Sequence, residues 1–156
     1  MIRKIVSGGQ TGADRAALDV ALDLGIPCGG WVPKGRLAED GEIPVCYPHL
    51  VEAEDAEPHT RAALNVRDSD ATLILAQGEL HGGSRFTAST AIKEGKPYLH
   101  VDLAHLSVPD AVREIARWLA VTCPAKLNVA GPRASEDPLI YSKTKRVLKA
   151  VLTSDD

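Results

Sequence analysis

Aromatic residues are scarce in this sequence. Phe, Trp and Tyr together make up 4% of its 156 residues, so a core must come from Ala, Val, Leu and Ile. No apolar run is long enough to span a bilayer, which excludes a transmembrane helix. The N-terminal segment "MIRKIVSGG" has no signal-peptide pattern. We therefore expect a cytoplasmic protein with no membrane partner.

Cysteine is rare as well, and basic charge is not in excess. Cys28, Cys46 and Cys123 form no Cys-x-x-Cys pair and no zinc-type spacing. We expect three reduced and mostly buried thiols, while a sulfur or soft-metal contact by one of them stays open. The formal net charge of −3 gives no general attraction to nucleic acid, so no nucleic-acid partner is expected.

Short apolar runs alternate with amphipathic stretches along the whole chain. Strands are predicted at 2–6, 27–31, 71–76, 98–101 and 126–130, and helices at 13–24, 58–66, 87–94, 108–119 and 140–151. Residues 32–50 are expected to form a long irregular loop. Strand–helix alternation requires crossover connections, so the prediction is a single α/β domain, 1–156, with a mostly parallel sheet between two helical layers.

Glycine-rich turns follow three of the predicted strands. They are Ser7-Gly8-Gly9, the segment 78–83, and Gly131-Pro132. A helix that begins beside such a turn offers free backbone N–H groups to an anion, and three turns of this kind favour a phosphate or oxyanion site. The alternative is that each glycine only serves a tight turn. The candidate binding residues in these turns are Gly8, Gly9, Gln10, Thr11, Gly12, Gly82, Gly83, Ser84 and Thr87.

Lys34 and Arg36, in the long loop, are candidate cations for the same anion, although they are equally compatible with solvated loop charges. Their position also argues against NAD, because a dinucleotide site wants an acid after the second strand. In addition, "SGGQTG" has Ser7 in place of the first fingerprint glycine. The segment "GWVPKGRL" lacks the Lys-Ser/Thr pair of a Walker A loop, which argues against an ATPase.

Two groups of polar residues allow more than one interpretation. Asp14 and Asp19 are most simply assigned to the polar face of the first helix. Arg61, Asn65 and Asp68 fall at i, i+4 and i+7 of the second predicted helix, on one stripe. This stripe faces either solvent or a polar pocket.

Several long segments together resemble the molybdenum-cofactor carrier family. They are "VSGGQTGADRAALD", "GGWVPKGRLAEDGEIP", "NVRDSDATLIL", "GKPYL" and "LNVAGPRASEDP". The resemblance implies a Rossmann-like fold, a homo-oligomer, and a carrier that binds, protects and hands on the molybdenum cofactor (molybdopterin). Molybdate or a nucleotide remains possible as ligand. The implied partners are molybdoenzymes or proteins of cofactor biosynthesis.

The same family resembles the lysine-decarboxylase-like phosphoribohydrolases, whose P-G-G-x-G-T-x-x-E pattern carries a catalytic glutamate. Here the stretch reads "HGGSRFTASTA", and no acidic residue lies between His81 and Glu94. This departure argues against that hydrolysis, and we predict no catalytic residue. Two alternatives stay open, a nucleotide sensor and an enzyme acting on a phosphoribosyl compound. The candidate bases of such an enzyme are Asp68, Asp70 and Asp102.

Overall fold

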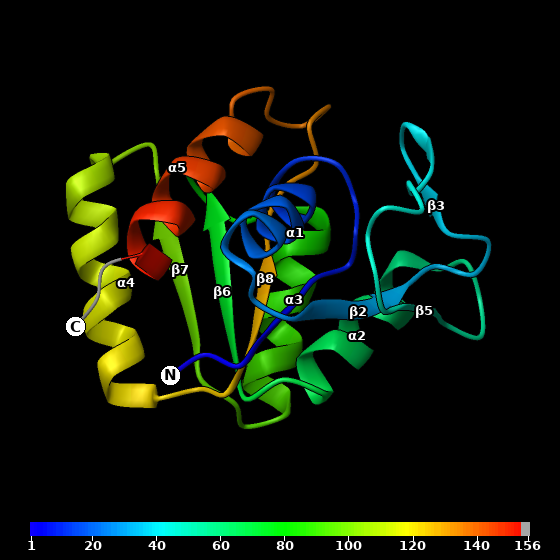
Figure 1. Cartoon of the computed structure of the whole chain (residues 1–156), viewed down its shortest axis with the longest axis horizontal. Coiled ribbons are helices and arrows are strands. Elements are labelled where there is room, and N and C mark those ends of the chain that lie inside the picture. The colour runs from blue at the N-terminus through cyan, green and yellow to red at the C-terminus, as the bar shows by residue number, and fades with distance from the viewer. Residues whose placement is uncertain (154–156) are drawn as a thin grey trace.

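The strand β6 (Ala71–Ala76) lies at the centre of the fold, and all of its residues are buried. It pairs in parallel with a strand on each side, and helices cover both faces of the sheet (Figure 1). The computed structural model describes residues 1–153. The last three residues of the expected 1–156 domain lie outside the described residues.

Strands and helices alternate along the chain, with a small hairpin inserted after the second strand. The strands are β1 (Lys4–Val6), β2 (Cys28–Val32), β3 (Leu37–Ala38), β4 (Gly41–Glu42), β5 (Leu50–Glu52), β6, β7 (Tyr98–Asp102) and β8 (Lys126–Ala130). The helices are α1 (Ala13–Leu24), α2 (Pro58–Arg67), α3 (Gly82–Lys93), α4 (Val108–Thr122) and α5 (Ile140–Thr153).

The main sheet has the order β5-β2-β1-β8-β6-β7, and every pair in it is parallel. Helices α1, α4 and α5 pack together on one face, while α2 and α3 pack on the other (Figure 1). The antiparallel pair β3-β4 is separate from this sheet. The predicted three-layer, Rossmann-like α/β fold is therefore confirmed.

Local signals in the sequence place several helix ends. Gly25 ends α1 in the left-handed conformation, and its backbone N–H donates to the last turn of the helix. Ser107 begins α4, with its side chain accepting a hydrogen bond from Asp110 N at 3.2 Å. The expected apolar face of α5 is buried throughout, from Ile140 to Val151.

The structure corrects the expected irregular loop at 32–50. This segment contains the hairpin β3-β4, and it leads into a further strand, β5, that pairs with β2 at the edge of the sheet. Both features were missed because their strands are only two or three residues long and mostly exposed, so no apolar periodicity marks them.

Three smaller predictions also need correction. The helix expected at 87–94 begins already at Gly82, because glycine is tolerated in a first turn although it is a poor helix former. The first strand begins at Lys4 and not at residue 2. The thiols were expected to be mostly buried, but only that of Cys28 is, and burial raises its pKa. Cys46, between β4 and β5, and Cys123, directly after α4, are exposed.

The stripe of Arg61, Asn65 and Asp68 is turned toward the protein at Arg61 and Asn65, whereas Asp68 is exposed. Asn65 is 2% exposed, and its side chain accepts from Trp31 N at 2.7 Å and donates to Trp31 O at 3.0 Å. Asp68 accepts from the indole N–H of Trp31 at 2.6 Å. The amide of Asn65 thus forms hydrogen bonds with both backbone groups of Trp31, as a paired strand would, and it connects α2 to β2.

Replacing Asn65 with Ala is expected to lower the free energy of unfolding by about 2–3 kcal/mol, because two backbone groups of Trp31 lose their partner. Urea denaturation of the purified variant measures this. Asp68→Ala is the control, since it removes only the exposed indole hydrogen bond, and it should cost less than about 1 kcal/mol. Equal costs for the two variants would contradict the assignment.

A candidate anion-binding site

The three glycine-rich turns lie side by side, because β1, β8 and β6 are consecutive in the sheet and parallel. A cavity of about 260 Å³ opens beside their carboxyl ends. Such a position, in an open parallel sheet, is where ligands of α/β proteins bind. The lining residues are Gln10, Asp14, Pro58, His59, Arg61, Ala62, Gly82, Gly83, Ser84, Thr87, Ala130, Gly131, Arg133 and Glu136.

A second hollow, of about 330 Å³, adjoins the first one. The two share Ser84 and Glu136 in their walls, and the second is otherwise lined by residues that follow β6 and β8, among them Gln77, His81 and Asp137. The two hollows are therefore neighbours at the N-terminus of α3.

The N-terminus of α3 is open toward the first cavity. Its N-cap residue, His81, makes no side-chain cap hydrogen bond, and its first turn holds no acidic residue. A Cβ atom added at Gly83 would have no heavy atom within 4 Å, and one added at Gly82 would meet only Glu136 Oε2, at 4.0 Å. The free N–H groups of this first turn and the positive helix end are thus accessible to an anion.

The N-terminus of α1 is filled by the protein itself. Above Gly8, an added Cβ would lie well under 3.0 Å from the guanidinium of Arg61. The backbone N–H of Gln10 donates to Asp14 Oδ2 at 3.3 Å. At Gly12, an added Cβ would collide with the backbone of Pro132. The loop at 8–12 therefore holds a carboxylate of its own chain where the sequence predicts a ligand anion.

Asp14 and Arg61 form a buried ion pair in the wall of the cavity. Arg61 Nη1 lies 3.6 Å from Asp14 Oδ2, with side-chain exposures of 15% and 4%. Burial raises the pKa of Asp14 to about 6, against the opposing attraction of Arg61. The assignment of Asp14 to a polar helix face was wrong, because this face of α1 is turned toward the loop and toward α2.

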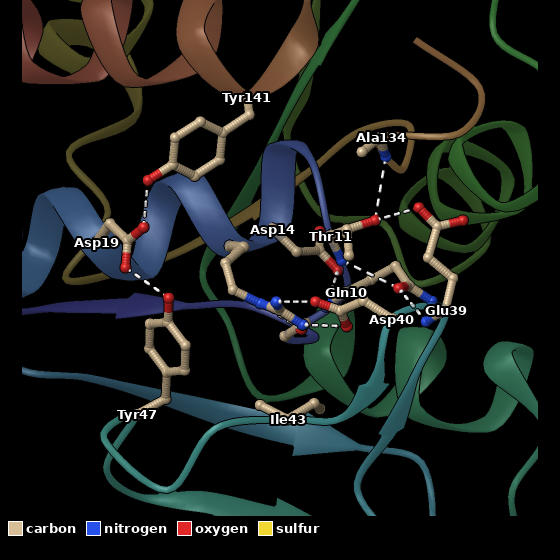
Figure 2. A network of polar contacts seen from close by, with 12 residues as sticks. Gln10, Thr11, Asp14, Asp19, Glu39, Asp40, Ile43, Tyr47, Ala134 and Tyr141 are labelled. Carbon is tan, nitrogen blue, oxygen red and sulfur yellow. Dashed lines mark hydrogen bonds and ion pairs between the residues drawn. The ribbon is translucent and has the colours of Figure 1, made fainter. Parts of the chain in front are cut away.

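The hairpin β3-β4 is hydrogen-bonded to the loop at 8–12 (Figure 2). Glu39 accepts hydrogen bonds from the hydroxyl of Thr11 and from Ser135 N at 3.1 Å. Hydrogen bonds from the hydroxyls of Ser135 and Thr11 hold the pKa of the Glu39 carboxyl below its usual value. Gln10 Oε1 accepts from Glu39 N at 2.8 Å, and Asp40 pairs with Arg15 at 2.8 Å. Gln10 and Thr11 therefore position this loop, and Gln10 also lines the cavity.

Lys34 and Arg36 do not line either hollow. Lys34 is exposed, and the half-buried Arg36 donates from Nη2 to the carbonyl oxygens of Ile43 and Pro44, each at 3.1 Å. The cations that do line the cavity are Arg61 and Arg133. Arg133 was not among the predicted residues, because it lies after the last strand of the sheet. The turn directly before it, Gly131-Pro132, was nevertheless one of the three turns predicted to hold an anion.

The remaining predicted residues fall into two groups. Gly82, Gly83, Ser84 and Thr87 line the cavity, whereas Gly8, Gly9, Thr11 and Gly12 do not. The hydroxyl of Thr87 donates to Gly83 O at 3.0 Å, so it stabilises the first turns of α3.

An exposed histidine stands at the mouth of the cavity. The ring of His59 stacks on Phe86, with centroids 4.0 Å apart and planes at 6°. Phe86 covers one face of the imidazole, and His59 is exposed and lines the cavity. A planar ligand ring could extend this stack. No sequence signal linked these residues, since α2 and α3 meet only in the folded chain.

The carboxylates considered as catalytic bases have structural partners. Asp70 precedes β6, at the amino ends of the strands and away from the cavity, and it accepts a hydrogen bond from Lys126 N at 2.8 Å. Asp102 accepts from Gly78 N at 2.7 Å and from His105, and these bonds lower its pKa to about 2. A carboxylate with so low a pKa is a poor base.

Residues 1–153 lack two further features. This part of the chain has no cluster of three or more His, Cys, Asp or Glu residues able to hold a metal ion. It also has no helix with the length and apolar character needed to cross a membrane.

The fold and the open helix terminus together define a Rossmann-like protein with a candidate anion-binding crevice. Residues 5–152 match the model of the circularly permutated YpsA SLOG family, and the chain belongs to this family. The structure is also similar to the crystal structure of a protein from Syntrophus aciditrophicus SB, described as "Putative molybdenum carrier protein". The TM-score is 0.95 and the sequence identity 50%, over 97% of this chain and 96% of that one. No curated protein matches the chain. The resemblance drawn from the sequence is confirmed.

Proposed function

We propose that this protein binds and protects the molybdenum cofactor and hands it on to molybdoenzymes or to proteins of cofactor biosynthesis. The observation that carries the proposal is the open N-terminus of α3, which faces a cavity that also holds Arg61 and Arg133. This is the chemistry that a terminal phosphate requires. The similar protein from Syntrophus supports molybdenum as part of the cargo.

The two adjoining hollows support this proposal, because together they offer more room than the first cavity alone. In this proposal the phosphate lies on Gly82 and Gly83, and the pterin extends past Ser84 and Glu136 into the second hollow. The molybdenum arrives inside the cofactor, held by the dithiolene of the pterin, so no thiolate of the protein is required. A homo-oligomer, as expected from the family resemblance, remains part of the proposal.

A nucleotide is the second candidate ligand, and the size of the first cavity favours it. At about 260 Å³ this cavity is slightly smaller than the usual ligand pocket of roughly 300–1,000 Å³. A mononucleotide would place its phosphate on α3 and its base against His59, without using the second hollow. The protein would then act as a nucleotide sensor or as an enzyme on a phosphoribosyl compound.

An anaerobic equilibrium titration with molybdenum cofactor, molybdate and AMP in parallel tests the two candidates. We expect the cofactor to bind at least about tenfold more tightly than AMP, because it can fill both hollows. Preference for AMP, or release of its base during the titration, would assign the crevice to nucleotides. Binding of none of the three ligands would overturn the anion site itself.

A further inference from the structure

The pair Asp14–Arg61 has two unusual features. First, Arg61 Nη1 and Asp14 Oδ2 are 3.6 Å apart, which is longer than a hydrogen bond, although both side chains are largely buried. Second, Arg61 Nε is buried and has no hydrogen-bond partner among the described residues. Buried guanidinium groups are normally satisfied, so this arginine has donor capacity that the protein does not use. Arg61 also lines the cavity, so this unused donor belongs to a side chain that a ligand there can contact.

Asp14 and an anion bound at α3 would depend on the same positive charge. The groups that face it are Arg61 on α2, the backbone N–H of Gln10, and Arg15 on its own helix. Across the same cavity lie His59, Arg133 and Glu136. Arg15 is already paired with Asp40, and Arg133 lies 3.5 Å from Glu136. A phosphate dianion on α3 would therefore compete with Asp14 for one guanidinium, that of Arg61.

We propose that Asp14 is a proton-linked counter-ion, which releases Arg61 to the bound anion by taking up one proton. In the free protein, Arg61 balances the Asp14 carboxylate. When a phosphate monoester binds at α3, Arg61 turns its unused donors to the phosphate, and a proton from solvent neutralises Asp14. Burial supports this step, because it brings the pKa of Asp14 to about 6, where protonation costs little near neutral pH. This inference rests on the proposed function, since it requires an anion at α3.

Calorimetric titration with AMP at pH 8, in two buffers of different ionisation enthalpy, counts the protons taken up. AMP shares the terminal phosphate monoester of the cofactor, and it is fully ionised at this pH, as is Asp14. We expect uptake of close to one proton per AMP bound. The affinity should fall by roughly tenfold per pH unit above pH 7, as required by the linkage of one proton to binding.

Asp14→Asn should abolish the proton uptake and should bind AMP at least about tenfold more tightly than the wild type at pH 8. Its side-chain oxygen can still accept from Gln10 N, which preserves the loop. Asp40→Asn is the matched control, because Asp40 is an acidic partner of Arg15 outside the cavity wall, and its proton uptake should equal that of the wild type.

Carbon-13 NMR of the Asp14 carboxyl in the unmodified protein provides a second measurement, independent of any variant. The titration midpoint should rise from about 6 to roughly 9 or above when AMP is bound, as uptake of close to one proton at pH 8 requires. Binding of AMP without proton uptake and without this rise would overturn the inference while leaving the proposed anion site intact. Failure of AMP to bind at all would overturn the anion site, and this inference with it.

Discussion

The substitution Gly83→Asp is expected to abolish anion binding while leaving the fold intact. Residue 83 lies in the first turn of α3 and lines the cavity, and a side chain there meets no heavy atom within 4 Å of its Cβ. A carboxylate in this turn interacts favourably with the helix dipole, which should add about 0.5 kcal/mol to the free energy of unfolding. The same carboxylate occupies the position proposed for the ligand phosphate.

Two charges about 4 Å apart near a protein surface repel by about 4 kcal/mol, so the affinity for AMP or the molybdenum cofactor should fall at least about 100-fold. Equilibrium titration and thermal unfolding of the same preparation measure the two effects. Gly83→Asn is the matched control, because it has the same size without the charge, and it should lose less than about tenfold. Unchanged affinity in Gly83→Asp would show that the anion binds elsewhere.

The second large effect is expected at Gly30, where Gly30→Ala should destabilise the protein by about 4 kcal/mol or more. Gly30 lies in β2 with a φ of +145°, and an added Cβ would lie well under 3.0 Å from the carbonyl oxygen of Ser7. It would also approach Asn65 Oδ1 to 3.1 Å. Both neighbours are backbone or hydrogen-bonded groups that cannot move without breaking the contact between β1, β2 and α2.

Urea denaturation measures the cost at Gly30, and the yield of soluble protein is a second readout. Gly41→Ala is the control, since Gly41 also has a positive φ, +111°, but an added Cβ there meets nothing within 4 Å. Its cost should be only the conformational one, about 1–2 kcal/mol. If the two variants were equally stable, the close approach of β1 to β2 would have no energetic role.

Much of the fold could be predicted from the sequence because its signals are local. Residues 71–76 were predicted as a strand, and β6 is buried along its whole length. The helices predicted at 13–24 and 108–119 end and begin at local signals, Gly25 and Ser107. The edge strand β5 could not be predicted in this way, because it is three residues long and is defined by its pairing with β2. Pairing between distant segments leaves no periodic pattern in either one.

The sequence by itself determined the α/β order of elements, the family, and the three glycine turns at the carboxyl ends of β1, β6 and β8. It predicted that the helix termini after these turns bind an anion, and only the tertiary structure shows how these termini differ. Arg61 and Asp14 lie at the terminus of α1, whereas among the described residues no heavy atom lies within 4 Å of a Cβ added at Gly83 on α3. The physical reason is that the N–H groups of a helix end are set by the local backbone, whereas Arg61, which packs against Gly8, comes from a distant element, α2.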